Sequence, residues 1–239
     1  MSGTIPYERD PHIEESFWDS IVDDLLPEDS EEKKILDQIF SKRRVLDSRK
    51  SMQKSGFIVL SAPERPVIIA THEKLKGYII KAYLDSYSID AGMKFKRRID
   101  GARLIQRSIE AHGYEDLMKT PGKWLYALPV DSKSTDDAPR HYFIILCEKL
   151  DILNDEKNEI AYKKQMNKPL LEALFTILTE NVLIDSTYID NVPFCKDGRL
   201  AFIDTEHFNV TDRPLKLHHL QSKLSSKLQT YWMELIEGH

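Results

Sequence analysis

Apolar residues recur with a helical period in several separate stretches of the chain. They return every three or four positions over residues 13–26, again after Ser30, and then across 155–182 and 215–236. Such spacing places the apolar side chains on one face of a helix. Ser30 stands where an N-cap hydroxyl would accept a hydrogen bond from the first turn of the second helix. The pattern therefore predicts helices in all four regions.

The middle of the chain has the pattern of a sheet interrupted by one helix. Short β-branched and aromatic runs separated by turn residues predict strands at 57–60, 67–71, 78–84, 123–128 and 141–150. Between the third and fourth runs, apolar residues at helical spacing predict a helix over 96–112 that ends at Gly113. The expected fold class is α+β. Four arginines of this helix are expected on its solvated face: Arg97, Arg98, Arg103 and Arg107.

The composition is that of a globular protein without extreme charge. Of the 239 residues, 41% are hydrophobic and 31% are charged, which suffices for a sizeable core. The formal net charge of −5 argues against a general nucleic-acid binder. No apolar run is long enough for a membrane span, and the N-terminus lacks the pattern of a signal peptide. We expect a cytoplasmic protein without nucleic acid or membrane span, with export by a dedicated secretion system left open.

The chain has two cysteines, and both lie inside apolar runs typical of strands. Cys147 and Cys195 are therefore predicted to be buried thiols. Two such cysteines make neither a disulfide framework nor a zinc site. This use of cysteine agrees with a reducing compartment.

Residues 191–206 predict a hairpin with polar residues at its outer ends. Two apolar arms flank a Lys-Asp-Gly turn at 196–198. Asn191 precedes the first arm and Asp204 follows the second, thirteen positions later. Because a hairpin brings its outer ends together, we expect these two side chains to converge, and amide and carboxylate oxygens suit Mg²⁺. The alternative is an ordinary hairpin with polar ends.

This hairpin resembles the segment between the catalytic-loop asparagine and the metal-binding aspartate of protein-kinase-like phosphotransferases. Gly198 falls where that family commonly has a turn glycine. The ending Ile203-Asp204-Thr205-Glu206 is closer to the IDxE of aminoglycoside and choline kinase relatives than to Asp-Phe-Gly. The order of predicted elements agrees with the family over residues 55–206. The resemblance implies a two-lobed fold, with a small antiparallel-sheet lobe carrying one helix and a reduced, mainly helical large lobe.

The resemblance also implies a division into domains. Residues 1–50 would form an N-terminal helical extension, 51–150 the small lobe and 151–239 the reduced large lobe. The N-terminal helices either pack on the core or form an appendage that binds a protein partner, and we favour the first interpretation.

For the nucleotide, the resemblance implies three residues that contact it and one that pairs with the first of them. Lys81 would contact the phosphates of ATP, and Glu110 of the following helix would pair with Lys81. The backbone of Glu148 and Leu150 would hydrogen-bond the adenine. A lysine in a strand more often faces solvent, so the role of Lys81 depends on the rest of the family pattern.

For the reaction, the resemblance implies that Asn191 and Asp204 bind Mg²⁺ and that Asp185 is the catalytic residue orienting an acceptor hydroxyl. Two features depart from the family. The turn 61–66 has no glycine, although the family's phosphate-covering loop needs glycines. Ser186 stands where the family has its proton-accepting aspartate, and a serine is a poor proton acceptor.

Three functions stay open. The first is a minimal Mg²⁺-dependent phosphotransferase acting on a protein or small-molecule hydroxyl. The second is a catalytically inactive pseudokinase, which uses the same scaffold as a binding or regulatory module. The third is an unrelated α+β interaction domain in which the hairpin is only structural.

Overall fold

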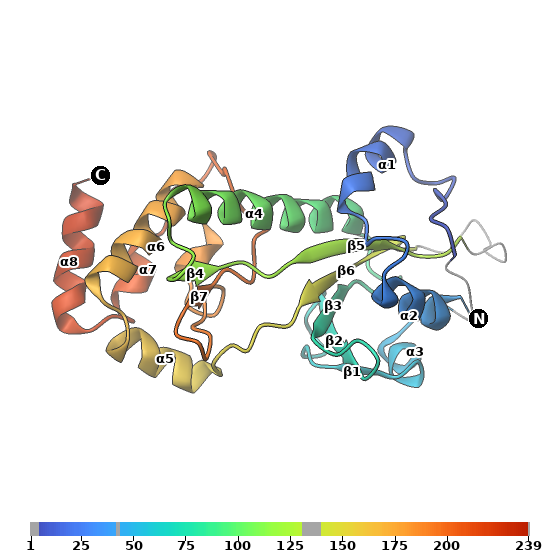
Figure 1. The fold of residues 1–239 in the computed structure, drawn as a ribbon, viewed down its shortest axis with the longest axis horizontal. Coiled ribbons are helices and arrows are strands. Elements are labelled where there is room, and N and C mark those ends of the chain that lie inside the picture. Colours follow the sequence, from blue (N-terminus) through green and yellow to red (C-terminus); the bar gives the residue numbers. More distant parts are fainter. Residues whose placement is uncertain (1–4, 42–43, 131–139, 239) are drawn as a thin grey trace. The chain divides into compact units, whose positions relative to one another are not determined.

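The computed structural model describes residues 5–41, 44–130 and 140–238, and the chain forms two compact units (Figure 1). The first unit contains Met1–Lys96 and Gly122–Lys149, and the second contains Arg97–Pro121 and Leu150–His239. The long helix α4 (Ala91–Ala111) begins in the first unit and continues in the second. The fold is α+β, as predicted. The domain bounds at residues 50 and 150 stay a prediction.

The first unit is built on a five-stranded sheet with the order β1-β2-β3-β6-β5 and antiparallel neighbours throughout. All five strands begin and end within or near the predicted runs. They are β1 (Phe57–Val59), β2 (Ile68–His72), β3 (Tyr78–Ala82), β5 (Lys123–Ala127) and β6 (Phe143–Glu148). The hydrophilic loop between β5 and β6 lies largely outside the described residues.

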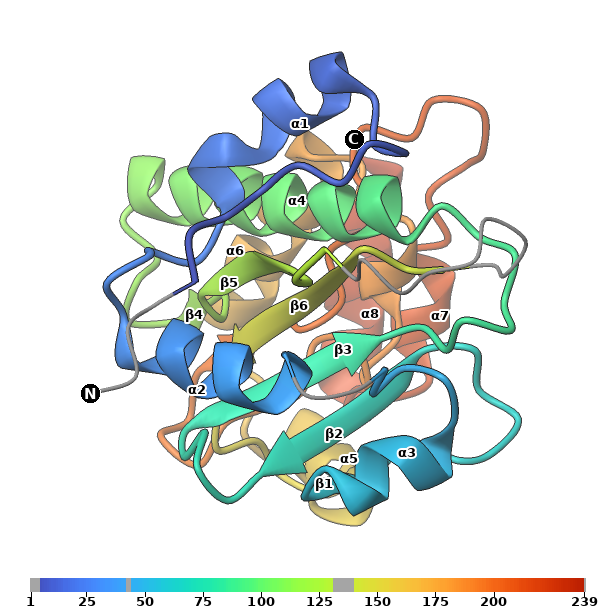
Figure 2. The same ribbon diagram turned by 90° about the vertical axis from the view of Figure 1, so that its right-hand side faces the viewer.

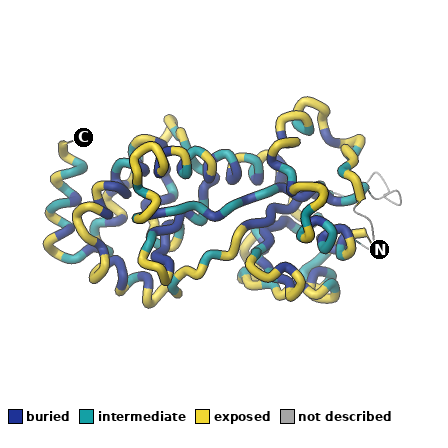
Figure 3. Tube along the Cα trace, in the orientation of Figure 1, coloured by how far each residue is buried: buried dark blue, intermediate teal, exposed yellow. Residues whose placement is uncertain are grey.

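Helices α2 (Glu31–Phe40) and α3 (Arg49–Lys54) cover one face of this sheet (Figure 2). Leu36 and Met52 from these helices share a buried core with Ile80 and Leu146 from the strands, and Figure 3 shows the strands largely buried. The Ser30 hydroxyl accepts a bond from Lys33 N at 3.2 Å, which confirms the predicted N-cap. Helix α2, the second of the two predicted N-terminal helices, therefore packs on the core, the interpretation that the sequence favoured.

The segment before α2 closes the β5 edge of the sheet. After α1 (Glu15–Ile21) and the 3₁₀ turn η1 (Val22–Asp24), Leu26 N donates to Leu125 O at 2.8 Å. An open strand edge presents unpaired backbone groups, so this contact protects it.

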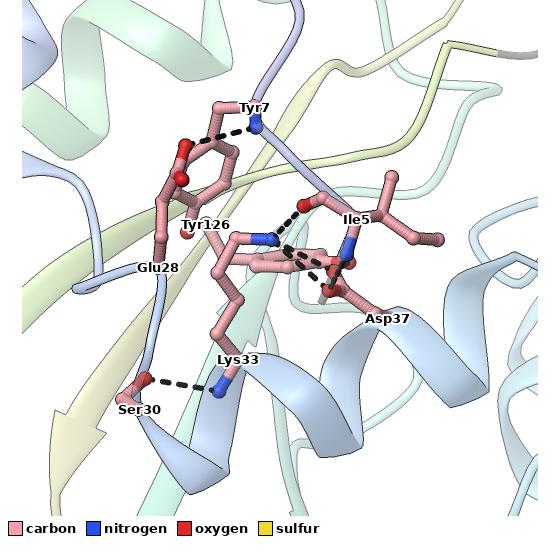
Figure 4. A network of polar contacts seen from close by, with 7 residues as sticks. All are labelled: Ile5, Tyr7, Glu28, Ser30, Lys33, Asp37 and Tyr126. Carbon is pink, nitrogen blue, oxygen red and sulfur yellow. Dashed lines mark hydrogen bonds and ion pairs between the residues drawn. The ribbon is translucent and has the colours of Figure 1, made fainter. Parts of the chain in front are cut away.

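A buried network of polar contacts fastens residues 5–7 to α2 (Figure 4). The Lys33 ammonium bonds both oxygens of Asp37, at 3.0 and 3.2 Å, and donates to Ile5 O. Asp37 also accepts from Ile5 N and from the Tyr126 hydroxyl, both at 2.9 Å. Burial, and then the charge of Asp37, raise the pKa of Tyr126, which keeps its hydroxyl a donor. Residues 5–7 are therefore anchored to α2.

Replacing Lys33 by Met should strongly destabilise the protein, because it leaves the buried Asp37 carboxylate without its cation. Removing one partner of a buried ion pair costs about 3–5 kcal/mol, and we expect a loss near the lower figure. The next residue gives a matched control. Lys34 pairs with Glu31 on the surface at 2.5 Å, and Lys34→Met should cost less than about 1 kcal/mol. Urea unfolding followed by circular dichroism measures both, and equal midpoints would contradict the prediction.

The second unit is mainly helical. Besides the later part of α4 it contains α5 (Asp155–Lys164), α6 (Lys168–Glu180), η2 (Asp185–Thr187), α7 (His218–Gln221) and α8 (Ser226–Glu237). Its core gathers Leu174 and Leu178 of α6 around Trp232 of α8, whose indole donates to Leu217 O at 2.9 Å. A short parallel pair, β4 (Met118–Lys119) and β7 (Leu200–Ala201), completes the unit.

The single helix predicted over 155–182 is wrong, because two helices share this stretch. Gln165 ends α5, and Asn167 begins α6 by accepting a bond from Leu170 N at 3.0 Å. Pro169 lies in the first turn of α6, where its missing N–H has no cost. Among the described residues, no helix is both long and apolar enough to cross a membrane.

Candidate functional site

The predicted hairpin is present in the second unit. Antiparallel backbone hydrogen bonds join its arms, and Gly198 takes φ +88° in the turn, a conformation that glycine adopts without strain. At the outer end, Ile203 N donates to Asn191 O at 3.1 Å. The backbone of Asn191 therefore meets the second arm one residue before Asp204. The expected approach of the two ends is confirmed for the backbone.

Two buried side chains of helix α5 bond the backbone of the first arm and of the residues just before it. The Asn158 amide donates to Ile189 O at 2.8 Å, and its carbonyl oxygen accepts from Phe194 N at 2.9 Å. The Tyr162 hydroxyl donates to Val192 O at 2.6 Å. Because each bond is made to the backbone, the path of the chain around Asn191 is fixed by α5.

The loop before the hairpin brings two predicted site residues together. The Asn191 side-chain amide donates to the backbone oxygen of Asp185 at 2.8 Å. The Asp185 carboxylate pairs with Nδ1 of His207 at 2.6 Å. Ser186, which follows Asp185, is buried with only 5% exposure. The side chains exposed at this loop therefore include Asp185 and its partner His207.

Segment 203–206 is held on α4 by a buried arginine. Arg98 Nη1 donates to Asp204 Oδ1 at 2.9 Å, and Nη2 donates to Glu206 Oε2 at 2.5 Å. The prediction of a solvated arginine face is therefore wrong for Arg98, which is buried. The sequence contained a signal: Arg98 stands four residues before the buried Ala102, on the apolar stripe of α4.

The same segment approaches the α4 backbone closely at Gly101. The Thr205 hydroxyl donates to Arg98 O at 2.5 Å. A Cβ atom placed on Gly101 would lie 1.9 Å from Thr205 O. A glycine is therefore required at this position of the helix.

Gly101→Ala should destabilise the protein, although the same change in a helix interior normally stabilises by about 1 kcal/mol. The reversal of sign follows from the clash with Thr205 O, and overpacking of this kind typically costs about 1–3 kcal/mol. Hydrogen exchange of residues 203–206 should accelerate in this variant. Arg107→Ala, on the exposed face of α4, is the control and should change stability by no more than about 0.5 kcal/mol. A stabilised Gly101→Ala would exclude this tight contact.

In the first unit, Lys81 lies on the sheet face opposite the α2–α3 core. It is directly opposite Ile69 of β2 and Ile145 of β6, and residues paired in this way point to the same face. Lys81 is 7% exposed, so it is not the solvent-facing lysine usual in a strand. At the β1 edge the same face carries Ile58, which is opposite Thr71 and 63% exposed. One buried lysine thus lies on a face that ends in exposed apolar surface.

The remaining predicted nucleotide contacts are placed as follows. Glu110 lies exposed on α4 and accepts a bond from Gln106 at 2.9 Å. Glu148 ends β6, where both its backbone N–H and its carboxylate bond the backbone of Gly122. Leu150 follows the sheet in irregular structure. Their assigned roles stay predictions.

The hairpin turn is fixed by charge. Arg199, and then Lys119, hold the pKa of the Asp197 carboxyl well below its usual range. Lys119 lies on β4 and bonds Asp197 at 2.8 Å, so the turn is tied to the parallel strand pair. Both predicted thiols, Cys147 and Cys195, are buried and free.

Asp204 and Asn191 carry a carboxylate and a side-chain amide oxygen, the two donor types that the sequence predicted for a magnesium ion. Carboxylate and amide oxygens are the ligands Mg²⁺ takes, with phosphate oxygens and waters completing its octahedron. Asp204 and Glu206 already hold one cationic group, the Arg98 guanidinium. In the described part of the chain, no group of three or more His, Cys, Asp or Glu side chains could hold a metal ion.

Two surface cavities of about 420 and 310 Å³ lie in the first unit, one beside the start of α4 and one beside η1. None of the predicted site residues lines either of them.

No model of a known protein family matches the chain, and no curated protein matches it in sequence.

Proposed function

We propose that this chain is a kinase-like nucleotide-binding protein that acts as a minimal Mg²⁺-dependent phosphotransferase on a protein or small-molecule hydroxyl. The observation that carries the proposal is the bond from Ile203 N to Asn191 O, which brings the backbone before Asp204 against Asn191. The Asn191 amide also holds the loop that carries Asp185. The amide, the carboxylate and the acceptor-orienting residue of the family's reaction thus have counterparts on one assembly.

Two features of the first unit support the same proposal. Its sheet consists of a three-strand meander and two further strands, and α4, which continues into the second unit, lies between them in the chain, the order that the resemblance implies for a small lobe. Lys81 on β3 is buried between Ile69 and Ile145. On this apolar face of the sheet the ammonium would contact the phosphates while the isoleucines contact the adenine.

Each residue has a role in the proposed reaction. Asn191 and Asp204 would hold Mg²⁺, which offsets the charge of the ATP phosphates. Lys81 would contact those phosphates, and Asp185 would keep the acceptor hydroxyl in line. Because phosphoryl transfer depends mainly on positioning and electrostatic stabilisation, a compact site is sufficient.

The proposal also includes the contacts to the adenine and the partner of Lys81. The backbone of Glu148 and Leu150 would bond the adenine, and Glu110 would pair with Lys81.

A pseudokinase is the second candidate, and the turn 61–66 favours it. This turn has no glycine, and Arg49 of α3 binds its carbonyls, with Nη1 to Ser61 O at 2.8 Å and Nη2 to Ala62 O at 2.7 Å. A turn held in this way is fixed to the helices instead of presenting free N–H groups to phosphates. In this candidate the protein binds nucleotide without transfer and acts through a protein partner at its N-terminal helices.

Asp204→Asn should abolish the Mg²⁺-dependent part of the stabilisation by ATP, because the variant keeps the side-chain shape but loses the charge. A ligand at 100 times its Kd stabilises the folded state by about 2.7 kcal/mol, which a melting curve resolves readily. Asp190→Asn, which removes an exposed charge next to Asn191, is the matched control and should melt like the wild type with MgATP.

The melting curves and a transfer assay with labelled γ-phosphate separate the candidates. Stabilisation together with transfer supports the phosphotransferase. Stabilisation of the wild type without transfer leaves the pseudokinase. A wild type that does not respond to MgATP contradicts both and leaves an interaction domain.

A further inference from the structure

We propose that His207 is the catalytic base of this protein and that Asp185 is the residue that positions it. The inference rests on the proposed phosphotransferase function and deepens it, because it supplies the proton acceptor that the sequence lacks. The observation behind it is the 2.6 Å pair between His207 Nδ1 and the Asp185 carboxylate, three residues after Asp204.

Ser186 cannot serve as the base. It occupies the sequence position of the family's proton-accepting aspartate, but its side chain is buried and a hydroxyl is a weak acceptor. Asp185 is 42% exposed but its carboxylate is already paired with the imidazole. The histidine is therefore the group that meets the substrate hydroxyl, and Asp185 orients that hydroxyl through His207.

The pair fixes the tautomer of His207. With Nδ1 facing the carboxylate, Nδ1–H donates to Asp185 Oδ2, and the lone pair lies on Nε2. The imidazole side chain is 36% exposed, so solvent and small molecules reach it. A carboxylate behind a histidine also stabilises the imidazolium that forms when Nε2 takes a proton.

The position of the pair is fixed from two sides. The Asn191 amide holds the Asp185 backbone at 2.8 Å, so the carboxylate projects from a fixed turn. His207 directly follows Glu206, which Arg98 holds on α4 at 2.5 Å. The charged groups nearest to the histidine in the chain are thus already paired, and its own partner is Asp185. A proton acceptor held on such a frame is preorganised.

The reaction step balances without any further reactant. The oxygen of the acceptor hydroxyl forms a bond to the γ-phosphorus of ATP while Nε2 of His207 takes the hydroxyl proton. The bond between the γ-phosphorus and the β,γ-bridging oxygen breaks, and its electron pair leaves with ADP. The imidazolium then releases the proton to solvent. With water as the acceptor, the products are ADP and inorganic phosphate.

The test uses the full chain, with MgATP as the probe and water as the acceptor, and it measures ADP release. His207→Gln keeps a side chain of similar reach but cannot take the proton. A general base contributes roughly 10²–10⁴-fold, and the loose transition state of phosphoryl transfer favours the lower end. We expect kcat to fall about 10²-fold while KM for MgATP stays unchanged.

Chemical rescue separates a base from a structural residue. Imidazole added to His207→Gly should restore part of kcat, because the free base can enter the space that the side chain left. Imidazole should not restore Asp185→Asn, in which the histidine still occupies its place without a positioning carboxylate.

A second histidine gives a matched control. His112 pairs with Glu180 at 2.8 Å in the same unit. Its side chain is 37% exposed, nearly the same as the 36% of His207, but it lies at the end of α4. His112→Gln should leave kcat and KM unchanged.

Three results would overturn the inference. The first is a His207→Gln variant with the kcat of the wild type, and the second is a kcat of His207→Gly that imidazole does not raise. The third is a wild type that MgATP stabilises but that releases no ADP, which refutes the base and leaves nucleotide binding intact. A wild type without any stabilisation by MgATP refutes the proposed function itself, a distinct failure.

Discussion

Segment 203–206 of the second unit depends on one buried guanidinium. The Arg98 side chain, in the first half of α4, bonds both Asp204 and Glu206. Bringing an arginine into the protein interior is costly unless its charge is compensated, and removing one partner of a buried pair costs about 3–5 kcal/mol. The arginine thus locks segment 203–206 against the helix. His207 directly follows this segment, so the contact restricts where its backbone lies.

The two ends of the site are fixed by different means. The loop before the hairpin and its first arm are tied by neutral hydrogen bonds from Asn158 and Tyr162 to the backbone, whereas the end of the hairpin is tied by charge through Arg98. Val182, between α6 and the loop, takes φ +45°, which is strained for a β-branched residue and typically costs about 1–3 kcal/mol. Strain at this point has to be offset by the surrounding bonds, which is common where a loop carries functional groups.

What could be predicted from the sequence was decided by how far apart the partners lie. The Ser30 cap and the Gly198 turn depend on neighbours a few residues away, and the apolar runs that mark the strands of the first unit are local patterns, so all of these were predicted correctly. The burial of Arg98 depends on Glu206, 108 positions along the chain, and no local pattern contains that partner. The anchoring of Ile5 by Asp37 could not be predicted for the same reason, because 32 positions separate the two residues. The end of α5 and the start of α6 do have a local signal, because Asn167 caps α6 and Pro169 follows it in the first turn.

The two carboxylates that share Arg98 differ in their access to solvent, and this difference assigns their roles. Glu206 is 8% exposed, so breaking its bond to Arg98 would leave a buried negative charge unpaired. Glu206 therefore has to stay bonded to Arg98. Asp204 is 35% exposed, so water or a cation can compensate its charge if the arginine bond is exchanged. In the ending Ile203-Asp204-Thr205-Glu206, the glutamate therefore fixes the segment to α4, and the aspartate is the carboxylate that is able to change partners. A magnesium ligand needs that freedom, which is why Asp204 and not Glu206 belongs to the proposed metal site.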